Sequence, residues 1–240
     1  MANNSNIEWT ESTWNPVTGC TKVSAGCQNC YAEKLANRLY AMGVKNYINK
    51  FELTIHKEAL NIPMKWRKPR MIFVNSMSDL FHEDIPLEFL KRIFNVMNEC
   101  SQHTFQILTK RSENMLKLSS KLKLTDNIWL GVTVENNASL YRISDLLKTN
   151  SKIKFVSFEP LLTSLPDLDT NGLDWAIVGG ESGYNARPMK EEWVIDIKNR
   201  CLNSNTAFFF KQWGGANKKK NGRLLQGRTW NAMPEYALSI

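Results

Sequence analysis

Three cysteines near the amino terminus are the residues in this sequence best suited to chemistry. Cys20, Cys27 and Cys30 have the spacing C-x6-C-x2-C. Three thiolates of one loop can bind three irons of a four-iron cluster and leave the fourth iron open to a small molecule. A structural zinc ion needs a fourth ligand, and the nearest histidine, His56, is distant along the chain. The spacing favours an iron–sulfur cluster; zinc completed by a distant residue and three unliganded structural thiols are the alternatives.

The two remaining cysteines, Cys100 and Cys201, lie within or near apolar helical patterns. The total of five is odd, which argues against a disulfide framework. Isolated cysteines in such patterns usually pack as small hydrophobic residues. We therefore expect Cys100 and Cys201 to be buried.

Polar and ionisable residues follow six of the short apolar runs in the sequence. Parallel strands of an α/β protein bring their carboxyl ends to one edge, where ligands bind. A single polar strand end means little, because any strand that meets water ends in polar residues, but six in succession predict a shared site. The residues are Ser78, Asp79, Thr109, Lys110, Arg111, Glu135, Asn136, Glu159, Gly179, Gly180, Glu181, Ser182, Lys211, Gln212 and Trp213.

Hydrophobic periodicity indicates the elements that must position these residues. Nearly all-apolar runs predict strands that are buried on both faces, and apolar residues at every third or fourth position predict helices. Most of the runs are followed by such a helical pattern. The expected strands are 13–17, 71–75, 105–108, 129–134, 153–158, 175–178 and 207–210, and the expected helices are 86–100, 112–122, 138–148 and 191–202.

Seven such strands predict an α/β fold with a mostly parallel sheet, arranged as a partial (β/α) barrel. A flat, doubly wound sheet is the alternative, which periodicity alone does not exclude; the shared polar edge favours the barrel. A further helix, with Leu35, Leu39 and Met42 on one face, is expected directly after Cys30.

Length and composition define the class of protein. The 240 residues are 42% hydrophobic and 22% charged, enough for a substantial core, and we expect a single domain, residues 1–240. No apolar run approaches the roughly 20 residues of a membrane span, and the first residues lack a signal-peptide pattern, so we expect a cytoplasmic protein. The net charge, 31 − 23 = +8, favours an anionic partner.

Basic and aromatic residues are mixed in a carboxyl-terminal extension, residues 211–240. Basic side chains neutralise phosphates and aromatic rings stack on bases, so a nucleotide or nucleic acid is a candidate partner. The alternative is a solvated loop with its tryptophans packed against the barrel. The residues concerned are Lys211, Trp213, Lys218, Lys219, Lys220, Arg223, Arg228 and Trp230, and a second, more ambiguous cluster is Lys65, Trp66, Arg67, Lys68 and Arg70.

Eight sequence blocks occur in order along the chain. They are TWNPVTGC (13–20), GCQNCYAE (26–33), VNSMSDLFHEDIP (74–86), FQILTKR (105–111), WLGVTVEN (129–136), FVSFEPLL (155–162), IVGGESG with ARPM (177–189) and FFFKQWGG (208–215). Together they resemble an uncharacterised phage and bacterial family with a three-cysteine motif. That family is similar to the radical S-adenosylmethionine (SAM) proteins of the spore photoproduct lyase branch. The resemblance implies a partial barrel of radical SAM type.

The resemblance also implies cofactors and a type of reaction. Cys20, Cys27 and Cys30 would bind a [4Fe–4S] cluster, and SAM would bind to its open iron. In radical SAM enzymes, one-electron reduction then cleaves the C5′–S bond of SAM and gives a 5′-deoxyadenosyl radical, which abstracts hydrogen from the substrate. An external electron donor is a partner that this chemistry requires.

Roles for strand-end residues follow from the same resemblance. Asp79, with Ser78 beside it, is placed to hold the methionine part of SAM. Lys110 could bind the carboxylate of SAM or an anionic substrate, and Glu135 and Asn136 could bind the ribose hydroxyls. The candidate cofactor-binding residues are Ser78, Asp79, Thr109, Glu135, Asn136 and Glu159; the candidate catalytic residues are Asp79, Lys110, Glu181 and the proton donor His82.

Two features depart from the radical SAM pattern. The usual cysteine spacing is C-x3-C-x2-C, and the Gly-Gly-Glu that grips SAM belongs after the second strand, whereas Gly179, Gly180 and Glu181 follow the sixth. Three functions are therefore open: a radical SAM-type enzyme acting on a nucleotide or nucleic acid, a zinc- or cluster-stabilised nucleic-acid-binding protein, and a non-catalytic accessory subunit of a partner protein. The group of strand-end residues favours the enzyme.

Overall fold

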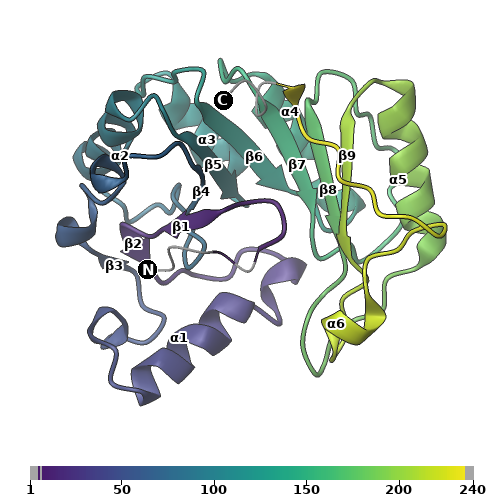
Figure 1. Ribbon diagram of the computed structural model, residues 1–240, viewed down its shortest axis with the longest axis horizontal. Coiled ribbons are helices and arrows are strands. Elements are labelled where there is room, and N and C mark those ends of the chain that lie inside the picture. Colours follow the sequence, from purple (N-terminus) through teal and green to yellow (C-terminus); the bar gives the residue numbers. More distant parts are fainter. Residues whose placement is uncertain (1–4, 6, 236–240) are drawn as a thin grey trace.

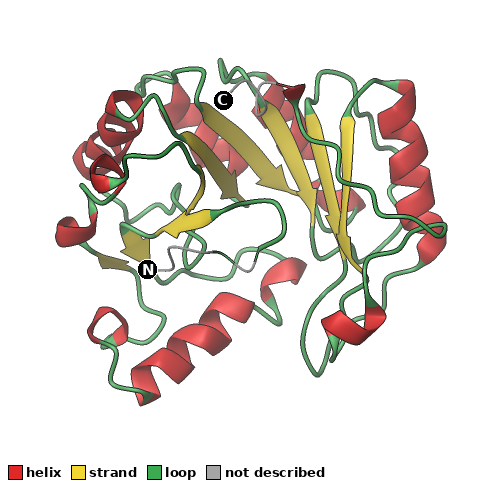
Figure 2. Cartoon of the chain, in the orientation of Figure 1, coloured by secondary structure: helices red, strands yellow, loops and turns green. Residues whose placement is uncertain are grey.

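Seven parallel strands form one curled sheet in the computed structural model, which describes residue 5 and residues 7–235 (Figures 1 and 2). The strands follow each other in the order β1-β4-β5-β6-β7-β8-β9. A second, antiparallel sheet pairs β2 (Val17–Thr18) with β3 (Thr54–Ile55). The bounds of the main strands are β1 (Ser12–Trp14), β4 (Met71–Val74), β5 (Thr104–Thr109), β6 (Ile128–Thr133), β7 (Lys154–Phe158), β8 (Trp175–Gly179) and β9 (Ala207–Gln212).

The strand order separates the two architectures that the sequence left open. A doubly wound sheet reverses its strand order at a switch point, whereas here each strand of the main sheet lies beside the previous one along the chain. Crossovers of one hand that advance in one direction place their helices on one face of the sheet. The expected partial (β/α) barrel is therefore confirmed.

Helices cover the outer face of the curled sheet (Figure 1). Helix α1 is separate and lies on the side toward which the strand arrowheads point. Within residue 5 and residues 7–235, no helix is long and apolar enough to cross a bilayer. The helices are α1 (Tyr31–Ala41), α2 (Leu87–Glu99), α3 (Ser112–Ser119), α4 (Tyr141–Leu147), α5 (Glu191–Asn203) and α6 (Lys218–Asn221), with 3-10 turns η1 (Ala25–Cys27), η2 (Lys45–Tyr47), η3 (Lys57–Ala59), η4 (Pro63–Lys65) and η5 (Asn137–Ser139).

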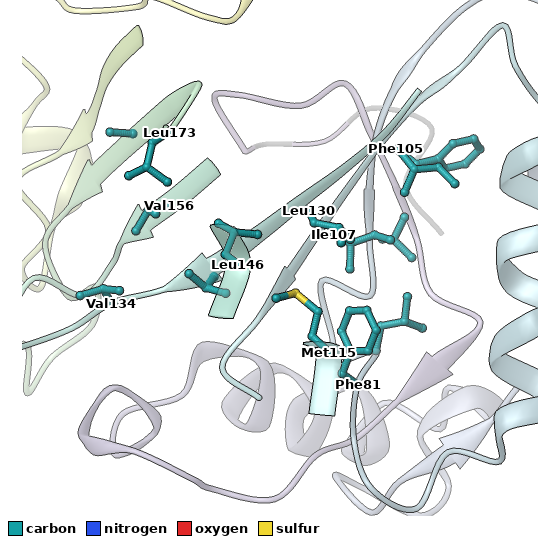
Figure 3. Close-up of a cluster of buried hydrophobic side chains, with 14 of the residues drawn as sticks. Phe81, Phe105, Ile107, Met115, Leu130, Val134, Leu146, Val156 and Leu173 are labelled. Carbon is teal, nitrogen blue, oxygen red and sulfur yellow. The ribbon is translucent and has the colours of Figure 1, made fainter. Parts of the chain in front are cut away.

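The main core fills the space between the sheet and these helices (Figure 3). Ile107 of β5 and Leu130 of β6 point outward and pack in one cluster with Met115 of α3 and Leu146 of α4. All four side chains are fully buried. Because successive residues of a strand face opposite sides, the intervening residues must line the concave side.

Aromatic rings fill the amino-terminal part of that concave side. The Trp9 ring lies 4.8 Å from the Phe73 ring of β4 and 6.0 Å from the Trp175 ring of β8. Four strand intervals span about 19 Å in a flat sheet, so one side chain reaches both rings only because the sheet curls. A Cβ atom at Gly131 would lie 2.5 Å from the Phe155 ring, so glycine leaves room for that ring inside the curl.

Two elements differ from their predicted form. The expected strand 13–17 is divided, because β1 ends at Trp14 and the next residues enter the second sheet. Helix α1 does form after Cys30, but it buries Ala32 and Ala36 rather than its larger apolar residues. Met42 is 66% exposed, because α1 packs through alanines against the turn after β4 and lies away from the main core.

The carboxyl-terminal extension returns along β9. The Phe210 N–H donates to the Trp230 carbonyl at 2.9 Å, and the Trp230 ring packs against Phe208. The Trp213 ring lies 4.8 Å from the Phe210 ring. The tryptophans therefore pack against the barrel, with the Arg228 guanidinium 3.6 Å from the Trp230 ring centre. The last part of the extension, 236–240, lies outside the described residues.

The two isolated cysteines are buried, as expected. Cys100 lies at the end of α2 and Cys201 within α5, and both are free thiols. Burial raises the pKa of Cys201 to about 12. A thiol that keeps its proton at neutral pH and packs among hydrophobic residues serves the core.

Candidate functional site

The three clustered cysteines lie on residues 19–30, the segment between β2 and α1, which we call the cysteine loop. Cys20, Cys27 and Cys30 are all free and half-buried. Within the part of the chain that the structure describes, no three His, Cys, Asp or Glu side chains are grouped closely enough to hold a metal ion. The three thiols thus share one loop without forming a preassembled set of ligands.

Arg111, directly after β5, fastens the start of this loop to the edge of the sheet. Its Nη1 donates to Cys20 Sγ at 3.4 Å, and its Nη2 donates to the Thr21 hydroxyl at 2.6 Å and the Thr21 carbonyl at 3.2 Å. The same guanidinium lies 2.9 Å from Glu83 and 3.5 Å from Asp79. Since Arg111 is only 6% exposed, its charge is balanced by these two carboxylates in a largely dry position.

His82 supports the same threonine. Its Nδ1 accepts the Asp84 backbone N–H at 3.2 Å, so the ring proton lies on Nε2, which donates to the Thr21 hydroxyl at 2.9 Å. The side chain is buried. Both ring nitrogens are therefore engaged, with Nε2 holding the cysteine loop, and the role of His82 as a proton donor stays a prediction.

Asp79 has every acceptor position occupied by the chain itself. Its Oδ1 accepts from the Thr109 hydroxyl at 2.6 Å and from the Phe81 N–H at 3.0 Å, and its Oδ2 accepts from the Lys110 N–H at 3.0 Å and from Arg111. A carboxylate offers about four acceptor sites. Asp79 and Thr109 therefore join the ends of β4 and β5 and position Arg111.

Two more of the predicted residues, Ser78 and Asn136, make local contacts. The Ser78 hydroxyl donates to the Val17 carbonyl at 3.1 Å. The side-chain oxygen of Asn136 accepts from the Ser139 hydroxyl at 3.1 Å. The backbone N–H of Asn136 donates to the same hydroxyl at 3.2 Å. Both residues lie at the expected edge of the sheet, where these bonds fix backbone turns.

Glu135, after β6, binds the middle of the cysteine loop. Its carboxylate accepts from the Ser24 hydroxyl at 2.5 Å and from Arg142 at 2.9 Å, and it is 1% exposed. A Cβ atom at Gly26 would lie 2.5 Å from the same carboxylate. Glycine at position 26 therefore allows the loop backbone to approach Glu135 this closely.

Glu181, after β8, binds the cysteine loop directly at Asn29 and through Arg187 at Ala25. Arg187 donates to the carboxylate from Nε at 3.0 Å and from Nη2 at 2.5 Å, while Nη2 also donates to the Ala25 carbonyl at 2.9 Å. The Asn29 amide donates to Glu181 at 2.9 Å. Although burial alone would raise it, these bonds lower the pKa of Glu181 to about 2. We call this arrangement the Glu181–Arg187 clamp.

Among the charged strand-end residues described, Lys110, Glu159 and Lys211 are only partly buried and remain accessible to a ligand. Glu159 and Lys211 form an ion pair at 2.8 Å, with 22% and 14% of their side chains exposed. Lys110 is 23% exposed, and its ammonium lies 3.9 Å from Glu135. Asn75 occupies the same edge with a buried amide that has no hydrogen-bond partner in the described chain. Buried polar groups are usually hydrogen-bonded, so an unpaired buried amide is unusual.

The electrostatic surroundings keep one of the three thiols protonated. Burial, followed by the charge of Asp79, raises the pKa of Cys20 to about 11, although Arg111 opposes the shift. Cys20 is therefore a thiol at neutral pH. Binding a metal would release its proton, as thiolate ligation requires.

The sequence predicted that the carboxylates lie at one edge of the sheet, but it did not predict which arginines pair with them. Arg142 and Arg187 contact Glu135 and Glu181 from other segments, and Arg111 was predicted at the edge without a role. One signal was available: a buried carboxylate needs a cation. The sequence does not show which cation folds back to each carboxylate.

Residues 4–234 match a family model described as "Protein of unknown function (DUF5131)". No curated protein and no solved structure matches the chain. The match extends over the cysteine loop and all the strand ends described above.

Proposed function

The chain belongs to the DUF5131 family, and from its site we propose that it is an iron–sulfur enzyme of radical SAM type. Cys20, Cys27 and Cys30 are the proposed ligands of a [4Fe–4S] cluster, and SAM is the proposed cosubstrate. The observation that carries the proposal is that the cysteine loop is attached to the carboxyl ends of four strands of a partial barrel. This edge is where barrel enzymes bind their ligands.

The attachment uses a backbone hydrogen bond after β4 and a different side chain after each of β5, β6 and β8. The Gly19 N–H donates to the Met77 carbonyl at 3.0 Å after β4. Arg111 after β5, Glu135 after β6 and Glu181 after β8 make the bonds described above. A loop that only crossed the barrel mouth would not require buried charged residues from three strands, because each one is costly to bury. The free-energy cost of burying these charged residues supports a functional role for the loop.

The donor types fit the proposed cluster. Thiolates are the usual ligands of iron–sulfur clusters, and three of them leave one iron free for a small molecule. The spacing of the sulfur atoms does not yet form a site, so binding must rearrange the loop. The loop can accommodate this, because only η1, a single turn that ends at Cys27, is regular structure and its sulfur-bearing residues are half-exposed.

The residues of the chain have two proposed roles, to bind SAM or substrate and to position the cysteine loop. When bound, the cluster supplies the electron that cleaves SAM. The accessible ammonium of Lys110 can bind a carboxylate or another anion, and the Glu159–Lys211 pair can bind a polar group deeper in the rim. Arg111 can stabilise the Cys20 thiolate by a charge-assisted hydrogen bond. Asp79 and His82 position Arg111 and Thr21.

Anaerobic reconstitution tests the proposal. The wild-type chain is expected to bind iron and acid-labile sulfide in equal amounts and to gain the broad visible absorbance of thiolate–iron charge transfer. With SAM and a strong reductant it is expected to form 5′-deoxyadenosine. Cys27→Ala is expected to lose all three properties, and the matched control Cys100→Ala, in which a buried cysteine of α2 changes, is expected to keep them.

Circular dichroism of each variant shows whether it is folded, so that loss of iron is not confused with unfolding. Bound zinc without iron would contradict the cluster. Iron binding that survives Cys27→Ala would contradict the assigned ligands. A bound cluster that forms no 5′-deoxyadenosine would contradict the radical SAM reaction.

A further inference from the structure

A cleft of about 400 Å³ opens beside the cysteine loop, between the loop and helices α3 and α4. Its volume is within the range of small-molecule sites, about 300–1,000 Å³. Val23 of the cysteine loop lines one part of it, Lys110 and Lys117 line another, and Tyr141 at the start of α4 lines a third.

The cleft is directly connected to the cysteines. Val23 lies between Cys20 and Cys27 in the sequence. Arg111 also lines the cleft, and its guanidinium donates to Cys20 Sγ at 3.4 Å. A molecule in this cleft would therefore lie one side chain away from a proposed cluster ligand.

The side chains that line the cleft have a net positive charge. Five charged side chains line it, and two of them, Arg111 and Glu83, pair with each other at 2.9 Å. The other three lining residues, Lys110, Lys117 and Glu113, have charges that sum to 2 − 1 = +1. Lys110 also lies 3.9 Å from Glu135, which does not line the cleft. Lys117 is exposed and makes no ion pair within the described residues. Lysine ammonium groups are frequent phosphate ligands.

An exposed aromatic ring faces the same space. Tyr141 is 48% exposed and Val23 is 45% exposed, and both line the cleft. Aromatic side chains bind nucleobases by stacking, and every base offers a face to stack on. A ring next to two lysines, of which Lys117 makes no ion pair within the described residues, suits a single nucleotide unit.

We propose that this cleft binds one nucleotide unit, with the base on Tyr141 and the phosphate at Lys117 and Lys110. The inference rests on the proposed function in one respect, that the bound nucleotide is the substrate of the cysteine-loop chemistry. The unit could be a free nucleotide or one residue of a single strand, since both present the same base and phosphate.

Binding to the purified chain tests this assignment without SAM turnover. Titration calorimetry with adenosine 5′-monophosphate and fluorescence anisotropy with a labelled single-stranded oligothymidylate cover the two sources. Lys117→Glu is expected to weaken binding at least about tenfold and to reduce its dependence on salt. Tyr141→Ala is expected to weaken it at least about fivefold.

Lys148→Glu is the matched control, because it changes the same charge on an exposed residue after α4 that does not line the cleft. It is expected to change the affinity by less than about twofold. Binding of the oligonucleotide alone would assign the cleft to a strand, and binding of both probes would assign it to free nucleotides as well. Either result, with the expected variant effects, supports the proposal.

The proposal is overturned if neither probe binds, if Lys117→Glu and Lys148→Glu weaken binding equally, or if Tyr141→Ala has no effect. These outcomes are distinguishable from failure of the proposed function. Iron content and 5′-deoxyadenosine formation report on the cysteines, whereas nucleotide affinity of Cys27→Ala reports on the cleft alone. If Cys27→Ala binds no iron but still binds nucleotide, the result supports the nucleotide site in the cleft. The iron–sulfur cluster is tested separately by iron content and 5′-deoxyadenosine formation.

Discussion

The Glu181–Arg187 clamp is expected to make the free energy of unfolding depend on pH, and Glu181→Gln is expected to remove that dependence. Glu181→Gln keeps the size of the side chain but replaces its charge with an amide. One of the two acceptor oxygens becomes an NH2 group, which faces the N–H donors of Arg187. The variant therefore loses the ion pair and leaves a partly buried cation without its partner.

The magnitude follows from the pKa of Glu181, which is lowered from 4.5 to about 2. That difference corresponds to about 3 kcal/mol. Because 29% of the Arg187 side chain is exposed, solvent screening reduces the expected contribution to about 2 kcal/mol. A carboxylate whose pKa is lowered by folding stabilises the protein fully above its unfolded pKa. It loses that contribution as the pH falls from about 4.5 toward 2.

Urea unfolding of the wild type and of Glu181→Gln, measured between about pH 7 and pH 3, tests this expectation. The wild type should be more stable by about 2 kcal/mol at neutral pH, and the difference should shrink steadily below about pH 4.5. Hydrogen exchange of residues 24–29 should be faster in the variant, because Arg187 also binds the Ala25 carbonyl. Glu192→Gln, which alters an exposed carboxylate of α5, is the control.

A stability difference that is constant across this pH range would refute the reasoning, since it would show that the charge of Glu181 is not what stabilises the clamp. Equal pH dependence in Glu192→Gln would refute it as well. Unchanged exchange of residues 24–29 would show that the clamp does not hold the cysteine loop.

Two further substitutions test how the loop is seated. Gly26→Ala places a methyl group 2.5 Å from the Glu135 carboxylate, and we expect a loss of about 1–3 kcal/mol in urea unfolding; an unchanged midpoint would contradict the close approach. His82→Ala removes the support of Thr21 and leaves a buried space, so we expect a loss of about 2–3 kcal/mol; wild-type stability would show that His82 is not a structural support.

The arrangement of strands and helices was largely predictable because each strand is a nearly continuous apolar run. Strand β5, for example, extends the predicted 105–108 by one residue at each end. The first strand was not predictable in this way. Pro16 has no N–H for a ladder, and the Asn15 side chain accepts the Met77 N–H at 3.2 Å, so the chain leaves the sheet after Trp14. The contacts of Trp9 inside the curled sheet join distant segments, so local spacing does not show them either.

The candidate site was predictable in its position but not in its connections. The alternation of strands and helices brings Asp79, Glu135 and Glu181 to one edge whatever their side chains do. Whether each carboxylate is free to bind a ligand depends on cations from other segments, and all three prove to be paired. Of the predicted charged residues, Lys110 and Glu159 keep side chains that solvent can reach. Local spacing carries no information on such long-range pairing.

The placement of Trp9 has a consequence for molecular traffic. The indole packs among Phe73, Phe155 and Trp175 and so occupies the concave side at the amino-terminal ends of the strands. The cysteine loop lies at the opposite, carboxyl-terminal edge. A ligand of the cysteines is therefore expected to approach from that edge and not through the interior of the half-barrel.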